Sequence, residues 1–453
     1  MQRAWSIAWR NLRRNRRRNL ATFAAIAFGY AGLILLGGYA VRVERFLAAN
    51  AVFLQQAGHV AVFAPGGLDC AGPEPLKCQL DPKAQKQVAD WAKADPRVER
   101  STKYLRGVGR AGNGCTTRPA QLVGVEMAEH RALLSHPALL AASPELAVPA
   151  KGQWPHAHAQ LKNGVALAAG LAALLQKPKV YSETVGLPPA PVVLGCDTPA
   201  AVTQLAADAN IQVVGLTYDG SLNAVDGEMT AVFHAPDPQG EEASMLLPLD
   251  LLQSLYATDR VTYVALLLRD PQQATQVAVD LKAQLSAAGA QVDTWTYQAN
   301  EWAPYYVGTM AFLGSMVGFI TLLVSVVLVL TVAGAMALAI LERTRELGTW
   351  RALGFERRHL SGLLVRESVL LSGLGLVTGL LIGLGVAAAV NASGQRFSPP
   401  GVAGSIQLLI TPSAWSCARQ ALLLPPGVAL ATWWVARGQL RKKAVDLLTT
   451  PTN

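Results

Sequence analysis

Long apolar runs are the dominant pattern of this chain. Residues 20–41 and 308–341 are almost free of charge, residues 368–390 form a third run, and residues 420–436 form a shorter fourth one. A helix needs about 20 predominantly apolar residues to cross a hydrocarbon core. The pattern therefore predicts four transmembrane helices. Because the second run is longer than one straight crossing needs, we expect that helix to extend beyond the bilayer as a stalk.

The third run has a glycine repeat. Gly375, Gly379 and Gly383 follow one another every four residues. This spacing places small residues on one helix face and permits close contact between membrane helices. We expect these glycines to pack against another transmembrane helix.

The segment 42–307 has a different pattern. Strand-like runs such as HVAVFA and VTYVALLLRD alternate with helical stretches such as PKAQKQVADWAKA. This alternation predicts a large α+β domain inserted between transmembrane helices 1 and 2. The composition becomes rich in Ala and Pro over about 130–210, which suggests an insertion between two halves of the domain.

The distribution of charge predicts which side of the membrane each segment lies on. Residues 1–19, 342–367 and 437–453 together carry 17 Lys and Arg but 5 Asp and Glu, whereas residues 42–301 carry 20 and 25. Lys and Arg are retained on the cytoplasmic side of a membrane. The distribution predicts cytoplasmic termini and a periplasmic α+β domain, and it disfavours nucleic acid as a partner despite the net charge of +9.

The remaining segments follow from this topology. Residues 1–19 carry Trp and Leu at helical spacing among arginines, which favours an amphipathic elbow helix on membrane lipid, although a disordered basic tail would also set the topology. Residues 342–360 form a cytoplasmic segment, residues 391–419 a periplasmic loop, and residues 437–453 a cytoplasmic tail.

Four of the five cysteines lie in the predicted periplasmic domain, where disulfides persist. They are Cys70, Cys78, Cys115 and Cys196. The even number fits two bridges, and sequence alone allows three pairings. The short spacing makes Cys70 with Cys78 the simplest choice, which leaves Cys115 with Cys196. Four unpaired buried thiols are the alternative.

The cytoplasmic segment 342–360 combines basic and apolar positions. Leu347, Trp350 and Leu353 fall at i, i+3 and i+6, with Phe355 shortly after, so a short helix would present one apolar face bordered by arginines. Such a helix suits a groove on a cytoplasmic partner, whereas the charge alone is equally typical of a solvated loop. The candidate coupling residues are Glu342, Arg343, Arg345, Glu346, Leu347, Gly348, Trp350, Arg351, Leu353, Gly354 and Phe355.

The run from Glu342 to Gly354, ERTRELGTWRALG, resembles the motif of the FtsX/MacB family of ABC permeases, in which a cytoplasmic coupling helix follows a long second transmembrane helix. The resemblance extends to AWRNLRRNRRR near the amino terminus, to Gly58-His59-Val60, to the glycine-rich third run and to the loop that begins with Ser398-Pro-Pro-Gly.

The resemblance implies a non-catalytic subunit that works by mechanotransmission. Two permease copies, identical or paralogous, would bind a cytoplasmic ABC ATPase dimer, and the long second helix would carry its motion to the periplasmic domain. The sequence has no G-x-x-x-x-G-K-[ST] loop. We therefore expect no cofactor on this chain, with ATP and Mg on the partner ATPase.

Cargo and location follow from the same resemblance. Because no ATPase is fused to the permease, the layout is nearest to the lipoprotein-release permeases LolC and LolE of the bacterial inner membrane. This implies a lipoprotein cargo and a periplasmic carrier. A MacB-like efflux role and an FtsX-like regulator of a periplasmic cell-wall hydrolase remain alternatives.

Two further groups of residues could carry chemistry, namely metal binding and proton transfer. His156 and His158 could share one face of a strand, but a third metal ligand is not evident, so a surface loop is the better interpretation. The carboxylates Glu342, Glu346 and Glu367 lie among arginines at membrane boundaries. We expect them to form ion pairs that support the structure rather than to carry protons.

Overall fold

The structure is a computed structural model that describes residues 10, 16–71, 78–158, 160–185, 196, 198–236, 239–397 and 406–441. It consists of two compact units. The helical unit comprises Met1–Glu44, Met310–Gln395 and Leu408–Asn453, and the α+β domain comprises Arg45–Thr309 and Arg396–Gln407. Most of the expected elbow helix 1–19, the loop that begins at Ser398 and most of the tail 437–453 lie outside the described residues.

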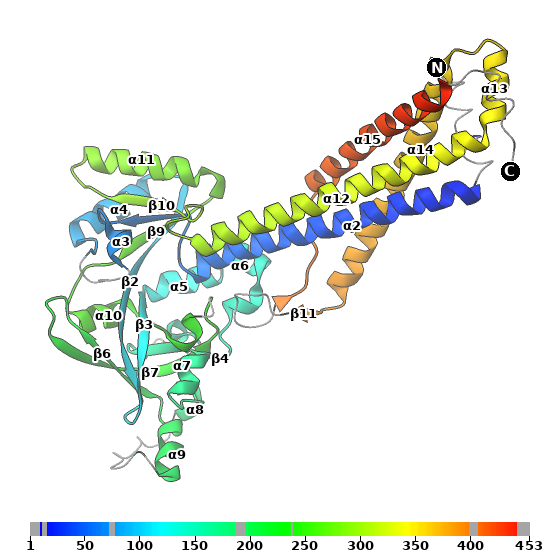
Figure 1. The fold of residues 1–453 in the computed structure, drawn as a ribbon. Helices are drawn as coiled ribbons and strands as arrows, with labels where there is room; N and C mark the ends of the chain where they lie inside the picture. Colours follow the sequence, from blue (N-terminus) through cyan, green and yellow to red (C-terminus); the bar gives the residue numbers. More distant parts are fainter. Residues whose placement is uncertain are drawn as a thin grey trace. The chain divides into compact units, whose positions relative to one another are not determined.

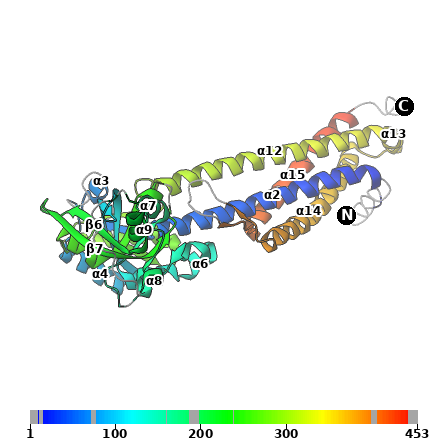
Figure 2. The ribbon, with the colours of Figure 1, turned by 90° about the horizontal axis from the view of Figure 1, so that it is seen from below.

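The helical unit is built from five helices among the described residues (Figures 1 and 2). They are α2 (Arg16–Ala49), α12 (Pro304–Glu342), α13 (Thr344–Ala352), α14 (Arg357–Ala392) and α15 (Ala414–Leu440). In this part of the chain three helices are long and apolar enough to cross a membrane, namely Asn19–Leu54, Pro304–Glu342 and Arg357–Ala392. The fourth expected crossing, 420–436, falls within α15, which contains Pro425 and Pro426 and is not among these three.

Two hydrophobic clusters hold the long helices together. One joins α2, α12 and α15, and the other joins all four long helices. Their buried members are Ile26, Val332, Met336, Ala339 and Val428, and Tyr30, Ile34, Leu328, Leu376 and Leu424. The hydroxyl of Tyr30 also donates a hydrogen bond of 2.9 Å to the carbonyl of Cys417 in α15.

The glycine repeat of α14 faces α2. A Cβ atom at Gly375 would lie 2.7 Å from the side chain of Ile26, one at Gly379 would lie 2.5 Å from the carbonyl oxygen of Ala27, and one at Gly383 would lie 3.2 Å from Ile34. Real Cβ contacts are essentially never below 3.0 Å. Only glycine therefore allows the two backbones to approach this closely at the first two positions.

Helix boundaries differ from the apolar runs. The helix expected at 368–390 begins eleven residues earlier, at Arg357, and the segment 342–360 contains the end of α12, all of α13 and the start of α14. Hydropathy locates the apolar part of a helix, whereas a helix continues until a residue breaks it. Polar residues between 357 and 367 do not break this one.

The α+β domain contains ten strands of one hydrogen-bonded network, in the order β10-β1-β9-β2-β3-β8-β5-β7-β4, with β6 between β2 and β7. They are β1 (Val60–Phe63), β2 (Val98–Gly112), β3 (Thr117–Val125), β4 (Lys151–Gly152), β5 (Gly164–Ala168), β6 (Asn210–Leu216), β7 (Leu222–Phe233), β8 (Ser244–Pro248), β9 (Tyr263–Leu268) and β10 (Asp293–Thr296). A separate short pair joins β11 (Arg396–Phe397) and β12 (Ile406–Gln407).

One end of this network is an open antiparallel sheet, β10-β1-β9-β2. Two helices pack against it, α4 (Pro82–Ala94) and α11 (Ala274–Ala287) (Figure 1). The carboxylate of Asp81 accepts a hydrogen bond of 2.8 Å from the amide of Ala84, with Pro82 at the first helical position. This cap explains why α4 begins there.

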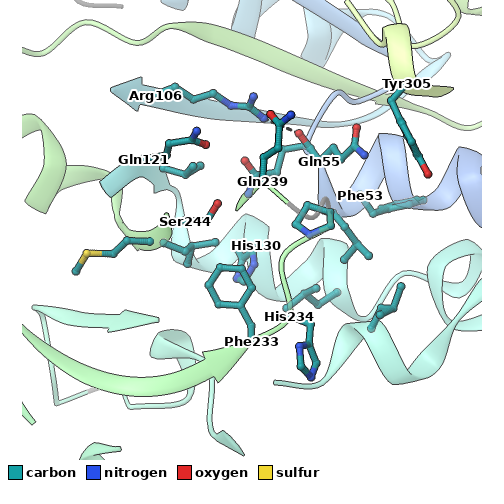
Figure 3. Close-up of a pocket in the computed structure, with 18 of the residues that line it drawn as sticks. Phe53, Gln55, Arg106, Gln121, His130, Phe233, His234, Gln239, Ser244 and Tyr305 are labelled. Carbon is teal, nitrogen blue, oxygen red and sulfur yellow. Dashed lines mark hydrogen bonds between the residues drawn. The ribbon is translucent and has the colours of Figure 1, made fainter. Parts of the chain in front are cut away.

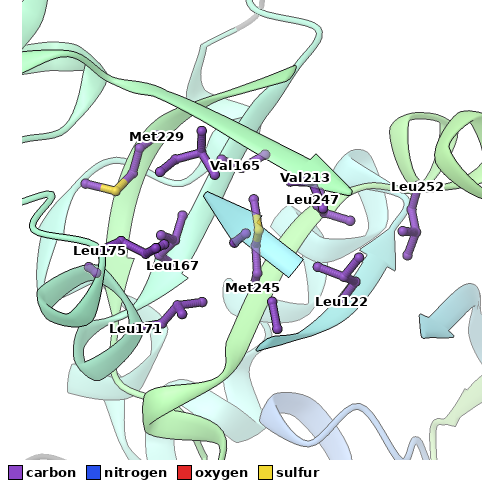
Figure 4. Close-up of a cluster of buried hydrophobic side chains, with 14 of the residues drawn as sticks. Leu122, Val165, Leu167, Leu171, Leu175, Val213, Met229, Met245, Leu247 and Leu252 are labelled. Atoms are coloured by element: carbon purple, nitrogen blue, oxygen red, sulfur yellow. The ribbon is translucent and has the colours of Figure 1, made fainter. Parts of the chain in front are cut away.

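The other end closes on itself. β2 pairs with β3 and β6, β3 with β8, β8 with β5, β5 with β7, and β7 with β6, so six strands form a closed ring of pairing. A ring this small is filled by side chains. Figure 4 shows its apolar filling, which includes Leu122, Val165, Leu167, Met229, Met245 and Leu247.

The segment 130–210 is not set apart as an insertion. Its strand β5 pairs with β7 and β8 inside the ring, and all five residues of β5 are buried. Its helices include α5 (Met127–Leu134), α6 (Pro137–Ala142), α7 (Ala169–Leu174), α8 (Tyr181–Thr184) and α9 (Pro199–Ala207). Ala and Pro enrichment here reflects short helices and turns between strands of the common sheet.

Further helices and the disulfides complete the domain. They are the short helices η1 (Asn50–Leu54), α3 (Gly67–Ala71), η2 (Pro144–Ala147), η3 (Pro155–Ala157), η4 (Gly240–Glu242) and η5 (Pro271–Gln273), and α10 (Leu249–Tyr256), which packs against the ring. The structure joins Cys70 to Cys78 and Cys115 to Cys196, and Cys417 is free. The first bridge closes a loop of 8 residues and the second one of 81.

Candidate functional site

The predicted coupling segment folds into α13 and a sharp turn. Gly354 has a φ of +91°, which glycine adopts without strain. The amide of Gly354 donates to the carbonyl of Arg351 at 3.1 Å, and the amide of Phe355 donates to the carbonyl of Trp350 at 3.1 Å. This is the Schellman pattern of a helix C-terminus, and the rings of Trp350 and Phe355, 5.3 Å apart, add the apolar contact that accompanies it.

The apolar face of α13 points into the helical unit. Leu347 is 8% exposed, and Trp350 packs beside it. The cluster around them comprises Ile340, Leu360, Leu364, Ala436 and Leu440. The expectation that Leu347 serves as a docking anchor is therefore wrong, because its side chain is already covered by the chain's own helices. Trp350 is half-buried in the same way.

The exposed apolar side chains lie at the turn instead. Leu353 is 74% exposed and Phe355 is 50% exposed. Three exposed arginines accompany them, Arg345 on α13 and Arg357 and Arg358 at the start of α14. We call these five residues the coupling tip.

Polar contacts fix α13 to its neighbours. Arg343 Nη1 lies 3.4 Å from Glu367 Oε2, with side chains 13% and 8% exposed, so this ion pair is mostly buried. Arg351 Nη1 donates to the carbonyl of Leu440 in α15 at 3.2 Å. These contacts link α13 to α14 and α15. Glu342 and Glu346 are exposed, and Gly348 is buried.

A small cavity of about 340 Å³ lies beside α13. Arg343, Glu346, Trp350 and Leu364 are among its lining residues. Its lining mixes charged and apolar side chains of α13 and α14.

The histidines of the α+β domain form ring contacts. His156 lies 5.7 Å from His130, and His158 lies 5.5 Å from Tyr181. Burial lowers the pKa of His130 to about 3, so this imidazole is neutral. Within the described ranges no group of three or more His, Cys, Asp or Glu side chains is placed to hold a metal ion.

The sequence indicates no binding surface in the α+β domain, but the structure contains a cavity of about 700 Å³ there (Figure 3). Its lining includes Phe53, Leu134, Leu146, Trp154, Phe233 and Trp302 as apolar or aromatic groups, and Gln55, Arg106, Gln121, Gln239 and Ser244 as polar ones. The alternation of inward and outward side chains along β2 and β3 could have indicated these lining residues. Leu105 and Leu122 fill the ring, whereas the adjacent Arg106 and Gln121 line the cavity.

A family comparison matches part of the chain. Residues 315–445, which include α13 and the coupling tip, match the model of the FtsX-like permease C-terminal family. A comparison with curated proteins finds no match.

Among solved structures, the extracellular domain of the noncanonic ABC-type transporter YknZ from Gram-positive bacteria matches at 10% identity and a TM-score of 0.29, covering 50% of this chain and 92% of that one. The periplasmic region of MacB from Actinobacillus actinomycetemcomitans matches at 10% identity and a TM-score of 0.32, covering 53% and 89%. Scores this low establish no common fold. The family match stands independently of them: residues 315–445 match the model of the FtsX-like permease C-terminal family, which supports the resemblance to FtsX/MacB-family ABC permeases drawn from the sequence.

Proposed function

We propose that this chain is the non-catalytic permease subunit of an ABC transporter complex and that its coupling tip binds a separate cytoplasmic ATPase. The observation that carries the proposal is the exposed pair Leu353 and Phe355, bordered by arginines, within the residues that match the permease family. Exposed apolar side chains in a basic rim suit insertion into a groove on a partner.

The tip is attached firmly enough to transmit force. Leu347 packs in an apolar cluster, and the pair of Arg343 with Glu367 ties α13 to α14. A displacement of the tip would therefore move α12 and α14 rather than bend α13 alone. α12 is continuous over 39 residues, about 58 Å at 1.5 Å per residue, and is long enough to carry that motion across a bilayer.

The ATPase would supply the chemistry, with ATP and Mg bound on its own subunits. A second permease copy, identical or paralogous, would complete the complex in the bacterial inner membrane, with both termini cytoplasmic. The work would be done at the α+β domain on the periplasmic side. We propose a lipidated or amphipathic cargo, with lipoprotein release to a periplasmic carrier as the specific form.

Co-purification with the co-expressed ATPase tests the docking. The double variant Leu353→Asp with Phe355→Asp places charges in the groove, so we expect about tenfold less bound ATPase. The variant Leu353→Met with Phe355→Leu keeps the apolar character and should bind normally. Normal co-purification of the Asp variant would overturn the docking assignment.

Cargo is tested separately. The complex, purified with its neighbours, should retain an acylated protein that is lost on ATP hydrolysis. Recovery of a cell-wall hydrolase in place of acylated cargo would contradict lipoprotein release while leaving ATPase docking intact.

A further inference from the structure

The cavity of the α+β domain has two chemically distinct regions. Figure 3 shows Gln55, Gln121 and Gln239 near Arg106, with the aromatic rings of Phe53 and Phe233 away from it. Leu134, Leu146 and Trp154 extend the apolar lining. A volume of about 700 Å³ lies within the range of small-molecule sites, roughly 300–1,000 Å³.

Arg106 lies at the polar region of the cavity. One guanidinium nitrogen, Nη2, donates to the carbonyl of Gln55 at 2.5 Å, and the group lies 5.4 Å from the ring centre of Tyr263 and 5.8 Å from that of Trp302. Its Nε is buried and has no hydrogen-bond partner among the residues that the structure describes. Across the described residues no Asp or Glu forms an ion pair with it.

A guanidinium in this setting would be stabilised by an anionic partner. Its Coulomb attraction is stronger beside apolar groups than in water, and a buried donor without an acceptor costs free energy. An anion that reached Nε would satisfy the donor and the charge together. The tyrosine and tryptophan rings hold the guanidinium in place but supply no negative charge.

Residues at the ends of two membrane-type helical segments are among those that line the cavity. Phe53 and Leu54 end the helical segment Asn19–Leu54, which contains an apolar window and, closer to the cavity, Arg42, Glu44 and Arg45. Pro304 and Tyr305 begin α12. The lining therefore includes the residues that directly continue two membrane-type helices.

We propose that this cavity binds an amphipathic anion, a single acyl chain lying against the aromatic lining with its negative head on Arg106. The proposal rests on the proposed function and names the class of its cargo. Gln55, Gln121 and Gln239 offer amide groups to the ester or amide that joins a chain to its head. A fatty acid, with its carboxylate, and an anionic membrane phospholipid, with its phosphate, share this chemistry.

Photo-crosslinking tests the site in the full chain, reconstituted in nanodiscs without nucleotide or ATPase. One arm uses palmitic acid with a diazirine near its methyl end, and the other uses a diazirine-bearing phosphatidylglycerol built into the bilayer. We expect adducts on peptides that contain Phe53 or Phe233. Unlabelled palmitate should compete with the palmitate probe, and hexadecanol should not, because it lacks the charge.

Three variants test the roles of charge and of space in the cavity. Arg106→Gln should lower the adduct yield about tenfold at a subsaturating probe concentration, and Arg106→Lys should retain most of it, since a charge is kept. Ser244→Phe, which fills the cavity from β8, should also reduce labelling while the thermal unfolding temperature shows that the chain is folded.

Labelling by either probe at these peptides supports the site, and the probe that labels more strongly identifies its source. Adducts confined to other parts of the chain, or equal labelling of wild type and Arg106→Gln, would overturn the proposal. Because neither ATPase nor nucleotide is present, this outcome is separate from any failure of the docking test.

Discussion

At the scale of single residues, the buried pair of Arg343 and Glu367 bears most directly on coupling. Its side chains are 13% and 8% exposed. A buried ion pair adds little net stability compared with apolar residues, but removal of one partner leaves an uncompensated charge. The pair therefore holds the start of α13 in place against α14.

Glu367→Gln should destabilise the helical unit by about 3 kcal/mol, because Arg343 loses its counter-charge in a mostly buried site. Thermal unfolding in detergent measures the loss. Glu356→Gln, at an exposed position beside α14, is the matched control and should be near neutral. Equal unfolding temperatures for Glu367→Gln and wild type would show that the pair is solvated.

Two buried imidazoles make stability depend on pH. Burial lowers the pKa of His59 to about 4 and that of His130 to about 3. The unfolded chain, with a histidine pKa near 6.5, binds more protons than the folded one between these values. Stability is therefore complete above about pH 6.5 and falls as the pH drops toward 4.

Urea unfolding of the full chain, followed by tryptophan fluorescence between pH 7 and 5, should show this decrease. His130→Phe replaces the imidazole with an apolar ring and should reduce the slope. A stability that rises on acidification would contradict the assignment of neutral buried histidines.

At the scale of elements, sequence patterns located helices well but not their partners. The glycine repeat of α14 indicated a close helix contact because its period puts all three residues on one face, and the structure places α2 there. The apolar face of α13 was equally visible. The surface that this face packs against could not be predicted, because the same amphipathic pattern occurs in a helix that packs on its own bundle and in one that binds another protein.

Gly379→Ala should weaken the contact between α14 and α2, because the added Cβ would meet a backbone carbonyl at 2.5 Å that cannot rotate away. We expect a loss of about 1–3 kcal/mol in thermal unfolding. At Gly385 a Cβ would meet nothing within 4 Å. Gly385→Ala should therefore be neutral or slightly stabilising through helix propensity, and similar losses for both variants would argue against the packing.

The two disulfides should differ in their contribution to the free energy of unfolding. The chain-entropy model assigns about 2 kcal/mol more to a loop of 81 residues, Cys115–Cys196, than to one of 8, Cys70–Cys78. Urea unfolding of the two double Cys→Ser variants measures the difference. A larger loss on removal of Cys70–Cys78 would contradict this ranking.

At the scale of the whole molecule, the sequence supports the division into apolar helices and an α+β domain, because charge and hydropathy vary over tens of residues. It does not reveal the closed ring of strands, since β2 pairs with β6 across about one hundred residues and pairing at that distance leaves no local pattern. The cavity beside Arg106 is hidden for the same reason, because its walls come from distant parts of the chain.

Photo-crosslinking in cells tests most directly whether the coupling tip contacts the ATPase. Benzoylphenylalanine would replace Leu353, Phe355 or, as the buried control, Leu347, whose side chain is 8% exposed. We expect an adduct with the mass of the ATPase at the first two positions and none at Leu347. An adduct at Leu347 with none at Leu353 and Phe355 would contradict it.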